Sequence, residues 1–395
     1  MISHLPSLLK KREMQVIVTI TMVTMMGGSV ISPALPAIQS AFSIPTASIG
    51  LVMTAFSIPG IIAIPIVGAL TDRYGRKKVI IPLLLLYGLA GGLCFFAPNF
   101  EALIVLRFLS GIGASSLATL TLILCGDFFI NDERSEALGY RTAFGQFANG
   151  TLPVIGGILA MLSWQFPFLL YFLAIPVTFF AMITLSDKPP PEKFKMAEYL
   201  TNLKLGLANF RIRCLLTIAP TLMIFNTGIV YTYLPIYLSH EFEISPALIG
   251  LIISTRIIAS TFVAFLIGKI TKIVKEEFLV IFSFSILAVA ATMVPMIKSL
   301  EHIFVPVLLM GLGIGIGLPT FQKLLIDETT AKLRAAIMSA NGVTNRIGQA
   351  SGPILGGFLY EFGDFETVFF GSSAFLILMI LFLSLNLFTD KRRNI

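Results

Sequence analysis

The chain repeats its glycine and proline landmarks with a fixed offset of 200 residues. The coinciding pairs are Gly50 with Gly250, Gly68 with Gly268, Gly111 with Gly311, Gly113 with Gly313, Pro153 with Pro353, Gly156 with Gly356, and Gly157 with Gly357. An offset that never slips requires equal helix and loop lengths in both copies. The sequence therefore predicts two structurally equivalent halves.

Apolar residues dominate this chain. Hydrophobic residues make up 56% of it and charged residues only 12%, whereas soluble domains carry about 25% charged residues. Runs of about 20 apolar residues, the length that crosses a bilayer as a helix, begin near positions 16, 49, 79, 101, 137, 165, 214, 247, 278, 302, 336 and 367. This pattern predicts an all-α integral membrane protein with twelve transmembrane helices, arranged as two six-helix bundles about a pseudo-two-fold axis.

A polar segment separates the two sets of apolar runs. It holds three consecutive prolines, residues 189–191, and mixed charges. We expect an N-terminal bundle at residues 1–185, a cytoplasmic linker at 186–210 and a C-terminal bundle at 211–395. Duplicated halves in a membrane protein are typical of carriers that bind their substrate between the halves. The sequence therefore predicts a membrane transporter.

Lysine and arginine are distributed very unevenly between the loops. With both termini in the cytoplasm, 24 of the 28 lie on the cytoplasmic side and only Lys298 lies in an outer loop. Such a bias predicts the orientation of a multi-pass protein, here in a plasma membrane such as the bacterial inner membrane. The net charge of +7 then reflects topology and contact with anionic lipids. The sequence contains no basic stripe with interleaved aromatic residues, which is the pattern that would suggest nucleic-acid binding.

Residues for catalysis or metal binding are sparse. His4, His240 and His302 fall outside the apolar runs or at their ends, and the three cysteines lie far apart. No nucleophile is paired with a base, and no metal-ligand spacing is present. We therefore expect neither an enzyme nor a metal site, and no cofactor.

The loop between the second and third apolar runs combines glycines with charged residues: Gly68, Asp72, Arg73, Gly75, Arg76 and Lys77. Gly68 is expected to let two helices approach closely, and Gly75 to permit a positive φ. Asp72 is placed to face the positive end of a neighbouring helix. Residues 68–77 closely resemble the signature loop of the major facilitator superfamily, Gly-x-Leu-x-Asp-Arg-x-Gly-Arg-Lys.

Two further segments resemble the same superfamily. Arg107-x-x-x-Gly111-x-Gly113 is similar to its second signature, with an arginine inside the membrane. Gly352-Pro353-x-x-Gly-Gly is similar to the element that marks the fifth span of its antiporters, although it lies here in the eleventh span. The resemblance covers the whole chain and points to the twelve-span drug and metabolite exporters, the drug:proton antiporters.

This resemblance implies a monomer with a central cavity that opens alternately to either side. It also implies that Asp72, Arg76 and Asp127 form a charge network that latches the outward-facing state. The residues expected to gate or couple transport are Gly68, Asp72, Arg73, Gly75, Arg76, Lys77, Asp127, Gly352 and Pro353. Lys272 stands at the second-half position of Asp72, so we expect the first half to dominate the latch.

Three arginines lie inside apolar runs, whereas all 21 acidic residues can be assigned to loops or helix ends. A charge at mid-helix costs about 2.5–3.5 kcal/mol on insertion scales and should face a cavity or a partner. Arg107, Arg256 and Arg346 are therefore candidates for a positive cavity that binds a carboxylate-bearing substrate through guanidinium groups. The alternative is structural, with each arginine bonded to helix carbonyls or to Asn and Gln side chains.

Asn149, Asn226 and Tyr231 complete the expected cavity wall as hydrogen-bonding residues in apolar surroundings. The sequence predicts a secondary active transporter of a small organic solute, acting as an exporter. Proton antiport is implied by the resemblance only. The absence of a mid-span acid leaves an alternative open, a carrier or flippase for one anionic metabolite or lipid without proton coupling through a buried carboxylate. The expected partners are this solute, protons and membrane lipids.

Overall fold

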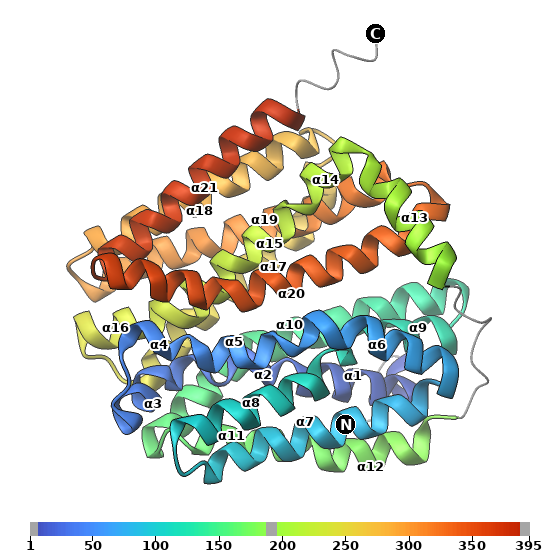
Figure 1. Cartoon of the computed structure of the whole chain (residues 1–395), viewed down its shortest axis with the longest axis horizontal. Helices are drawn as coiled ribbons and strands as arrows, with labels where there is room; N and C mark the ends of the chain where they lie inside the picture. Colours follow the sequence, from blue (N-terminus) through green and yellow to red (C-terminus); the bar gives the residue numbers. More distant parts are fainter. Residues whose placement is uncertain (1–6, 187–195, 388–395) are drawn as a thin grey trace.

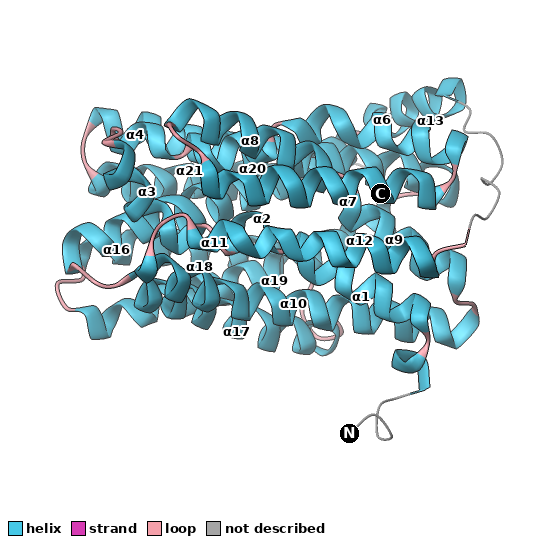
Figure 2. Cartoon of the chain, turned by 90° about the horizontal axis from the view of Figure 1, so that it is seen from below, coloured by secondary structure: helices cyan, strands magenta, loops and turns pink. Residues whose placement is uncertain are grey.

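The fold is built entirely from helices over the residues that the structure describes, 7–186 and 196–387 of a computed structural model (Figure 2). The helices run roughly parallel to one another and are joined by short loops. Apolar runs of bilayer length cannot expose their backbone to lipid, so helices satisfy the backbone hydrogen bonds within each span.

The first half contains six spans, several of them interrupted. Their elements are η2 (Ser7–Lys10), α1 (Arg12–Thr24), α2 (Met26–Ser29), η3 (Ser32–Ala34) and α3 (Leu35–Phe42) in span one; α4 (Thr46–Ile49), α5 (Leu51–Ser57) and α6 (Pro59–Tyr74) in span two; α7 (Arg76–Leu93) and η4 (Cys94–Phe96) in span three; α8 (Phe100–Ala114) and α9 (Leu117–Phe128) in span four; α10 (Asn131–Leu162) in span five; and α11 (Phe166–Leu169), η5 (Leu170–Leu173) and α12 (Ala174–Thr184) in span six.

The second half repeats this order after helix α13 (Met196–Ala208). Its elements are α14 (Phe210–Leu216), α15 (Ile218–Met223), the π-helix η6 (Ile224–Tyr233) and α16 (Leu234–Phe242) in span seven; α17 (Pro246–Ile270) in span eight; α18 (Glu276–Met296) in span nine; η7 (Leu300–Ile303) and α19 (Phe304–Glu328) in span ten; α20 (Ala331–Phe362) in span eleven; and α21 (Phe365–Leu387) in span twelve.

The predicted twelve-span fold is confirmed. Eleven segments of the described chain are long and apolar enough to cross a membrane by themselves. The twelfth span is α20, which carries polar residues such as Asn341 and Arg346 along its length. Helices α10 and α20 are both 32 residues long and start 200 residues apart. The repeat predicted from glycines and prolines is therefore also a repeat of helix length.

The two bundles meet along two helix pairs. In Figure 1 the first-half helices occupy the lower part of the view, most second-half helices lie in the upper part, and α16 lies beside α4 at the left. Helix α10 of the first half packs along α17 of the second, and α20 of the second packs along α5 of the first. These pairs are equivalent under the offset of 200, as a pseudo-two-fold axis requires.

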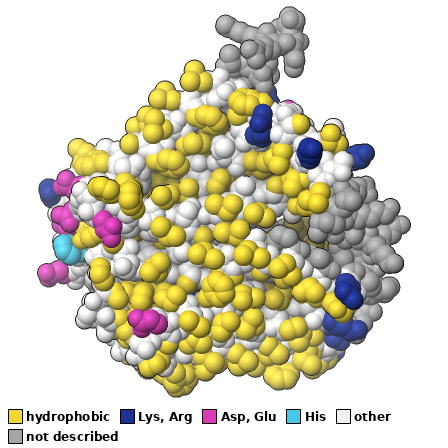
Figure 3. All heavy atoms as spheres, viewed as in Figure 1, with side chains coloured by type: hydrophobic (Ala, Val, Ile, Leu, Met, Phe, Trp, Pro, Cys, Tyr) yellow, Lys and Arg dark blue, Asp and Glu magenta, His cyan; other side chains and the backbone are white. Residues whose placement is uncertain are grey.

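Charged side chains mark the two ends of the molecule. On the face shown in Figure 3, most lysine and arginine side chains lie at one end, most acidic side chains and a histidine lie at the other, and hydrophobic side chains cover the band between them. We call the end with Lys11, Arg76 and Arg211 the basic end, and the end with Glu101 and Glu301 the opposite end. The exposed apolar band has the character of a lipid-facing surface.

The polar segment between the halves contains a helix that its prolines and charges did not predict. Helix α13 packs against α20, where Tyr199 donates a hydrogen bond from its hydroxyl to Ser339 Oγ over 3.2 Å. Gly206 faces the side chain of Ile337, because a Cβ at Gly206 would lie 2.4 Å from its Cδ1. The prolines at 189–191 lie outside the described residues.

Candidate functional site

A cavity of about 590 Å³ lies between the two bundles. Its described lining contains two cations, Arg256 and Arg346, and no acidic residue. Five lining residues carry primary carboxamides: Gln146, Asn149, Asn226, Gln322 and Gln349. The apolar part of the wall includes Met25, Met53, Phe56 and Met223. This cavity offers many hydrogen-bond donors, two positive charges and an adaptable thioether surface.

Arg256 on α17 is held against the seventh span. Only 3% of Arg256 is exposed. Nη1 donates to Asn226 Oδ1 over 3.0 Å, and Nη2 donates to the Tyr231 hydroxyl over 2.9 Å. The guanidinium also lies 5.1 Å from the centre of the Tyr231 ring. Its Nε is buried and has no hydrogen-bond partner.

The π-helix η6 is what brings both of these partners to Arg256. In an α-helix, five residues turn the chain by about 500°, which would leave Asn226 and Tyr231 about 140° apart. In a π-helix the hydrogen bonds join residues five apart, so such pairs lie on nearly the same face. The Thr232 hydroxyl donates to the carbonyl of Thr227, five residues earlier, over 2.7 Å. The local winding therefore builds the Arg256 site.

Arg346 on α20 reaches across the cavity to the other bundle. Its Nη1 donates to Gln349 Oε1 over 3.0 Å, and its Nη2 donates to the backbone carbonyl of Ser115 over 3.1 Å. Ser115 lies in the break between α8 and α9. A carbonyl at a helix end lacks its intrahelical partner and is free to accept such a bond. Arg346 is thus a polar link between the bundles at mid-span.

Arg107 does not line the cavity, contrary to expectation. Its side chain is fully buried and its three nitrogens are all occupied. Nε donates to the carbonyl of Val52 over 3.2 Å, Nη1 to the Tyr171 hydroxyl over 2.9 Å, and Nη2 to the carbonyl of Gly27 over 2.7 Å. The guanidinium also lies 4.4 Å from the centre of the Phe56 ring. Arg107 therefore has a structural role, because its guanidinium satisfies backbone carbonyls within the first bundle.

Four glycines close the bundles against each other toward the opposite end. A Cβ at Gly157 would lie 2.2 Å from the carbonyl oxygen of Pro246, and one at Gly357 would lie 2.3 Å from that of Ala47. The corresponding distances are 2.8 Å from Gly50 to Pro353 and 2.2 Å from Gly250 to Pro153. We call Gly50, Gly157, Gly250 and Gly357 the four-glycine seal. Four of the glycine landmarks of the sequence repeat are therefore contact points between the bundles.

Gly352 and Pro353 lie at this seal. Pro353 contacts Gly50 of the first bundle, as described above, while Gly352 packs against Gly228 of η6 within the second bundle. A Cβ at Gly352 would lie 2.9 Å from the Gly228 nitrogen, and one at Gly228 would lie 2.5 Å from the Gly352 carbonyl oxygen. The Gly-Pro element thus joins η6 to the seal.

The signature loop lies at the basic end, between α6 and α7. Gly75 adopts a φ of 89° at this turn, and Arg76 Nε lies 2.6 Å from Asp127 Oδ2. Arg73 is exposed with its guanidinium 5.3 Å from the ring of Tyr74, and the next lysine, Lys77, is half-buried. Asp72 belongs to α6, but its side chain lies outside the described part of the structure.

Gly68 does not make the close helix contact expected of it. It is exposed, and a Cβ there would meet no atom within 4 Å. The same holds for the Cβ of its repeat partner, Gly268. The reason is positional, because the seal brings the bundles together toward the opposite end, whereas both glycines lie toward the basic end.

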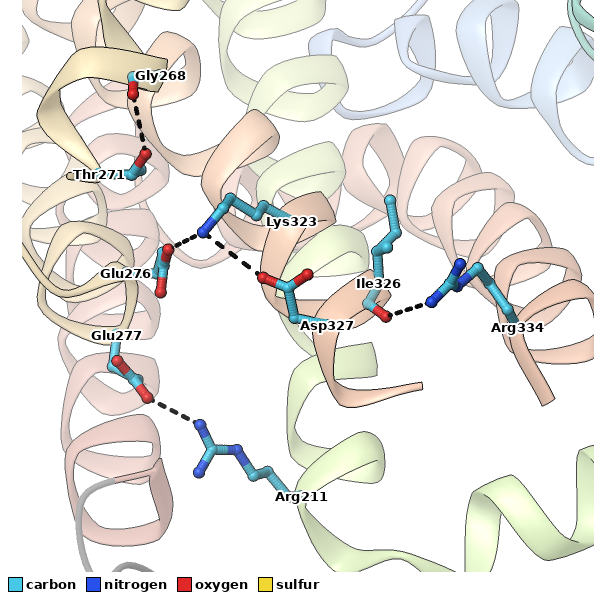
Figure 4. Close-up of polar contacts among 9 residues, drawn as sticks. All are labelled: Arg211, Gly268, Thr271, Glu276, Glu277, Lys323, Ile326, Asp327 and Arg334. Carbon is cyan, nitrogen blue, oxygen red and sulfur yellow. Dashed lines mark hydrogen bonds and ion pairs between the residues drawn. The ribbon is translucent and has the colours of Figure 1, made fainter. Parts of the chain in front are cut away.

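The second copy of the signature loop carries a charge network of its own (Figure 4). Lys323 pairs with Glu276 and, at 3.5 Å, with Asp327. Glu276 and Asp327 stand 200 residues after Arg76 and Asp127. The first half uses a cation facing an acid, and the second uses two acids bridged by a lysine. A comparison of loop glycines alone misses this exchange of signs.

Two further cations at equivalent repeat positions, Lys11 and Arg211, also form ion pairs. Arg211 pairs with Glu277 over 2.8 Å and with Glu328 over 3.0 Å. Its counterpart in the first half, Lys11, pairs with Glu133 over 2.6 Å. In both halves, a cation at the start of the first span is thus tied to an acid of the same bundle at the basic end.

The comparison with known families agrees with this geometry. The family model described as Major Facilitator Superfamily matches residues 17–212 and 216–395. The chain belongs to the major facilitator superfamily. This superfamily consists of transporters, so the chain is a multi-pass membrane transport protein and not an enzyme.

Two curated relatives of this chain are an exporter and an efflux pump. The Bacillibactin exporter of Bacillus subtilis (strain 168) is 27% identical over 383 residues, covering 93% of this chain and 94% of that protein. The Multidrug efflux pump SdrM of Staphylococcus aureus (strain N315) is 26% identical over 387 residues, covering 84% and 86%. A bacterial homologue of the human lysosomal transporter Spinster, solved in an inward-facing and occupied conformation, matches with a TM-score of 0.75 and 15% identity over 94% of this chain and 95% of that one.

Several lining residues of this facilitator were missed by sequence reasoning, above all Gln146, Gln322 and Gln349. Glutamine in an apolar helix attracts less notice than arginine because it carries no charge. One signal was available, since Gln146 stands 200 residues before Arg346. A polar residue at both copies of one repeat position indicates a shared face of the cavity.

Proposed function

We propose that this transporter exports small organic anions by alternating access, with Arg256 and Arg346 as the groups that bind the negative charge. The observation that carries the proposal is the charge of the cavity, since its described lining has two arginines and no acid. Guanidinium groups bind carboxylates through paired, charge-assisted hydrogen bonds. The exporter relatives support the direction of transport.

The size and surface of the cavity narrow the expected substrate. A volume of about 590 Å³ is in the range of sites for drug-sized molecules. The carboxamides suit carbonyl and hydroxyl groups, and the methionines with Phe56 suit an apolar body. An amphipathic anion with several hydrogen-bonding groups fits this wall better than a simple inorganic ion.

Transport by purified protein in liposomes tests this proposal. Aromatic carboxylates, neutral amides of the same shape and lipophilic cations would be compared for saturable movement. For a transported carboxylate, Arg256→Gln is expected to weaken apparent affinity at least about tenfold, because a hydrogen bond to a charged group is lost. The matched control is Arg141→Gln. Arg141 binds the carbonyl of Ala118 within the first bundle and is not among the cavity-lining residues.

A broad exporter of lipophilic cations is the second candidate. It is favoured by the apolar wall and by the multidrug efflux relative. The same assay separates the two, because transport of lipophilic cations with no response to Arg256→Gln would contradict the anion proposal. The pH inside the liposomes would be read in parallel. A substrate-dependent pH change would establish proton exchange, and its absence would favour a carrier without proton coupling.

The orientation and the domain limits also belong to the proposal. We infer that the basic end faces the cytoplasm, because 24 of 28 lysines and arginines fit that side. In that orientation the described conformation is closed toward the outside by the four-glycine seal. Residues 1–185 and 211–395 would move as two bundles about the cavity, joined by the linker at 186–210.

A further inference from the structure

We propose that η6 couples the occupancy of Arg256 to the four-glycine seal, with Asn226 and Tyr231 as the positioning residues. This inference rests on the proposed function in one respect, the role of Arg256 as an anion-binding group. Its structural basis is that η6 contacts both Arg256 in the cavity and the closed side of the molecule.

The cavity side of η6 is held by Arg256 through Asn226 and Tyr231, as described above. The seal side of η6 reaches the first bundle. Ser32 donates from Oγ to the carbonyl oxygen of Tyr231 over 2.6 Å, and Tyr233 donates from its hydroxyl to the carbonyl of Ala47 over 3.4 Å. Tyr231 therefore binds the guanidinium with its side chain and the opposing bundle with its backbone.

The winding of η6 depends on such contacts. A π-helix is rare and less favourable than an α-helix, so tertiary bonds must hold ten residues in this form. The bonds from Arg256 hold two residues five apart on one face. When either bond is lost, relaxation toward α-helical winding turns the Tyr231 carbonyl away from Ser32. The closed side then loses one of its hydrogen bonds between the bundles.

An anion in the cavity acts on the same bonds. A carboxylate accepts from a guanidinium more strongly than the neutral Oδ1 of Asn226 does, so an anion that reaches the cavity-lining guanidinium competes with Asn226 for Nη1. The Tyr231 hydroxyl can accept from Arg256 and donate its own proton to the anion. Binding therefore displaces Asn226 and loosens η6. Substrate in the cavity thereby favours opening of the seal.

The coupling between η6 and the seal is tested by measuring the distance between the two bundles in the absence of any ligand. Spin labels at Glu101→Cys and Glu301→Cys, which are exposed repeat partners at the opposite end, report the separation there by double electron–electron resonance in lipid nanodiscs. The three native cysteines are buried. Tyr231→Phe, which keeps the ring and removes the hydroxyl, is expected to raise the ratio of separated to closed molecules about tenfold. Asn226→Leu is expected to act in the same direction.

Two control variants make the result decisive. Ser32→Ala removes the bond to the Tyr231 carbonyl directly and should also favour separation. Tyr237→Phe removes a hydroxyl that donates to the carbonyl of Val294 within the second bundle, and should leave the distances unchanged. The coupling is refuted when Tyr231→Phe gives wild-type distances, when Ser32→Ala has no effect, or when Tyr237→Phe shifts them equally. Because no substrate is present, these outcomes do not depend on whether the liposome assay finds anion transport.

Discussion

The buried arginines Arg107 and Arg256 have different surroundings. Arg107 has a partner for each of its three nitrogens and no access to the cavity, whereas Arg256 lines the cavity with its Nε unpartnered. Each holds an interrupted span, because Arg107 binds the carbonyl of Gly27 in α2 and Arg256 binds side chains of η6. A guanidinium that lines a cavity can bind a ligand there, whereas one enclosed by carbonyls of its own bundle stabilises the fold.

Replacing Arg107 by lysine should therefore destabilise the protein. A lysine ammonium is a single donor centre and cannot reach the carbonyls of Val52 and Gly27 and the Tyr171 hydroxyl together. We expect a loss of about 2–4 kcal/mol in the free energy of unfolding, since buried acceptors lose their donors. The measurement is the melting temperature in detergent, with Arg73→Lys as the exposed control. Equal melting of the Arg107 variant and the wild type would contradict a structural role.

For single residues, the sequence identifies the right residue types but not the direction in which their side chains point. Arg107, Arg256 and Arg346 were all found, because a charge in an apolar run is conspicuous. Their roles depend on which helix face meets the cavity, and span boundaries do not fix that. The pairing of Asn226 with Tyr231 was also out of reach, since the two lie on different faces of an α-helix and only the π winding of η6 unites them.

Among the elements, α10 and α20 do most to hold the bundles together. Each carries a Pro-x-x-Gly-Gly sequence toward the opposite end, and each contacts the other bundle through the backbone. Close approach of this kind requires a glycine on the contact face. The sequence predicted where these two helices begin to within six residues, because apolar runs of bilayer length leave few alternatives, but not that each is 32 residues long.

A methyl group in the seal should keep the two bundles apart. In Gly157→Ala the new Cβ would sit 2.2 Å from the carbonyl oxygen of Pro246, so α10 and α17 cannot close without shifting. We expect a larger separation between labels at positions 101 and 301 and a slower transport cycle. Gly139→Ala on the same helix is the control, because a Cβ there meets nothing within 4 Å. A closed distance in Gly157→Ala would show that the seal tolerates a side chain.

The whole molecule is asymmetric between its ends. Ion pairs, including Arg76 with Asp127 and Lys323 with Glu276, gather at the basic end, while the seal toward the opposite end is made by backbone contacts at glycines. The sequence predicted the charge distribution from its loops. It could not predict which side is closed, because amino-acid composition is the same whichever side is closed.

Labelling of intact cells should establish which end is outside. A cysteine at Lys298, at the opposite end, is expected to react with a membrane-impermeant maleimide, and one at Lys78, at the basic end, is expected to react only after permeabilisation. Both positions are exposed, and the native cysteines are buried. Labelling of Lys78→Cys in intact cells would reverse the proposed orientation.

The chemistry of the seal has a consequence for the conditions under which this transporter can work. Contacts between glycine Cα atoms and carbonyl groups carry no titratable group and no net charge, so neither protons nor dissolved salt weakens them appreciably. With the proposed orientation, this charge-free closure faces the medium outside the cell, whose acidity and salinity the cell does not control. The salt-sensitive ion pairs lie on the buffered cytoplasmic side. The barrier against leakage should therefore hold equally well in dilute, saline and acidic surroundings.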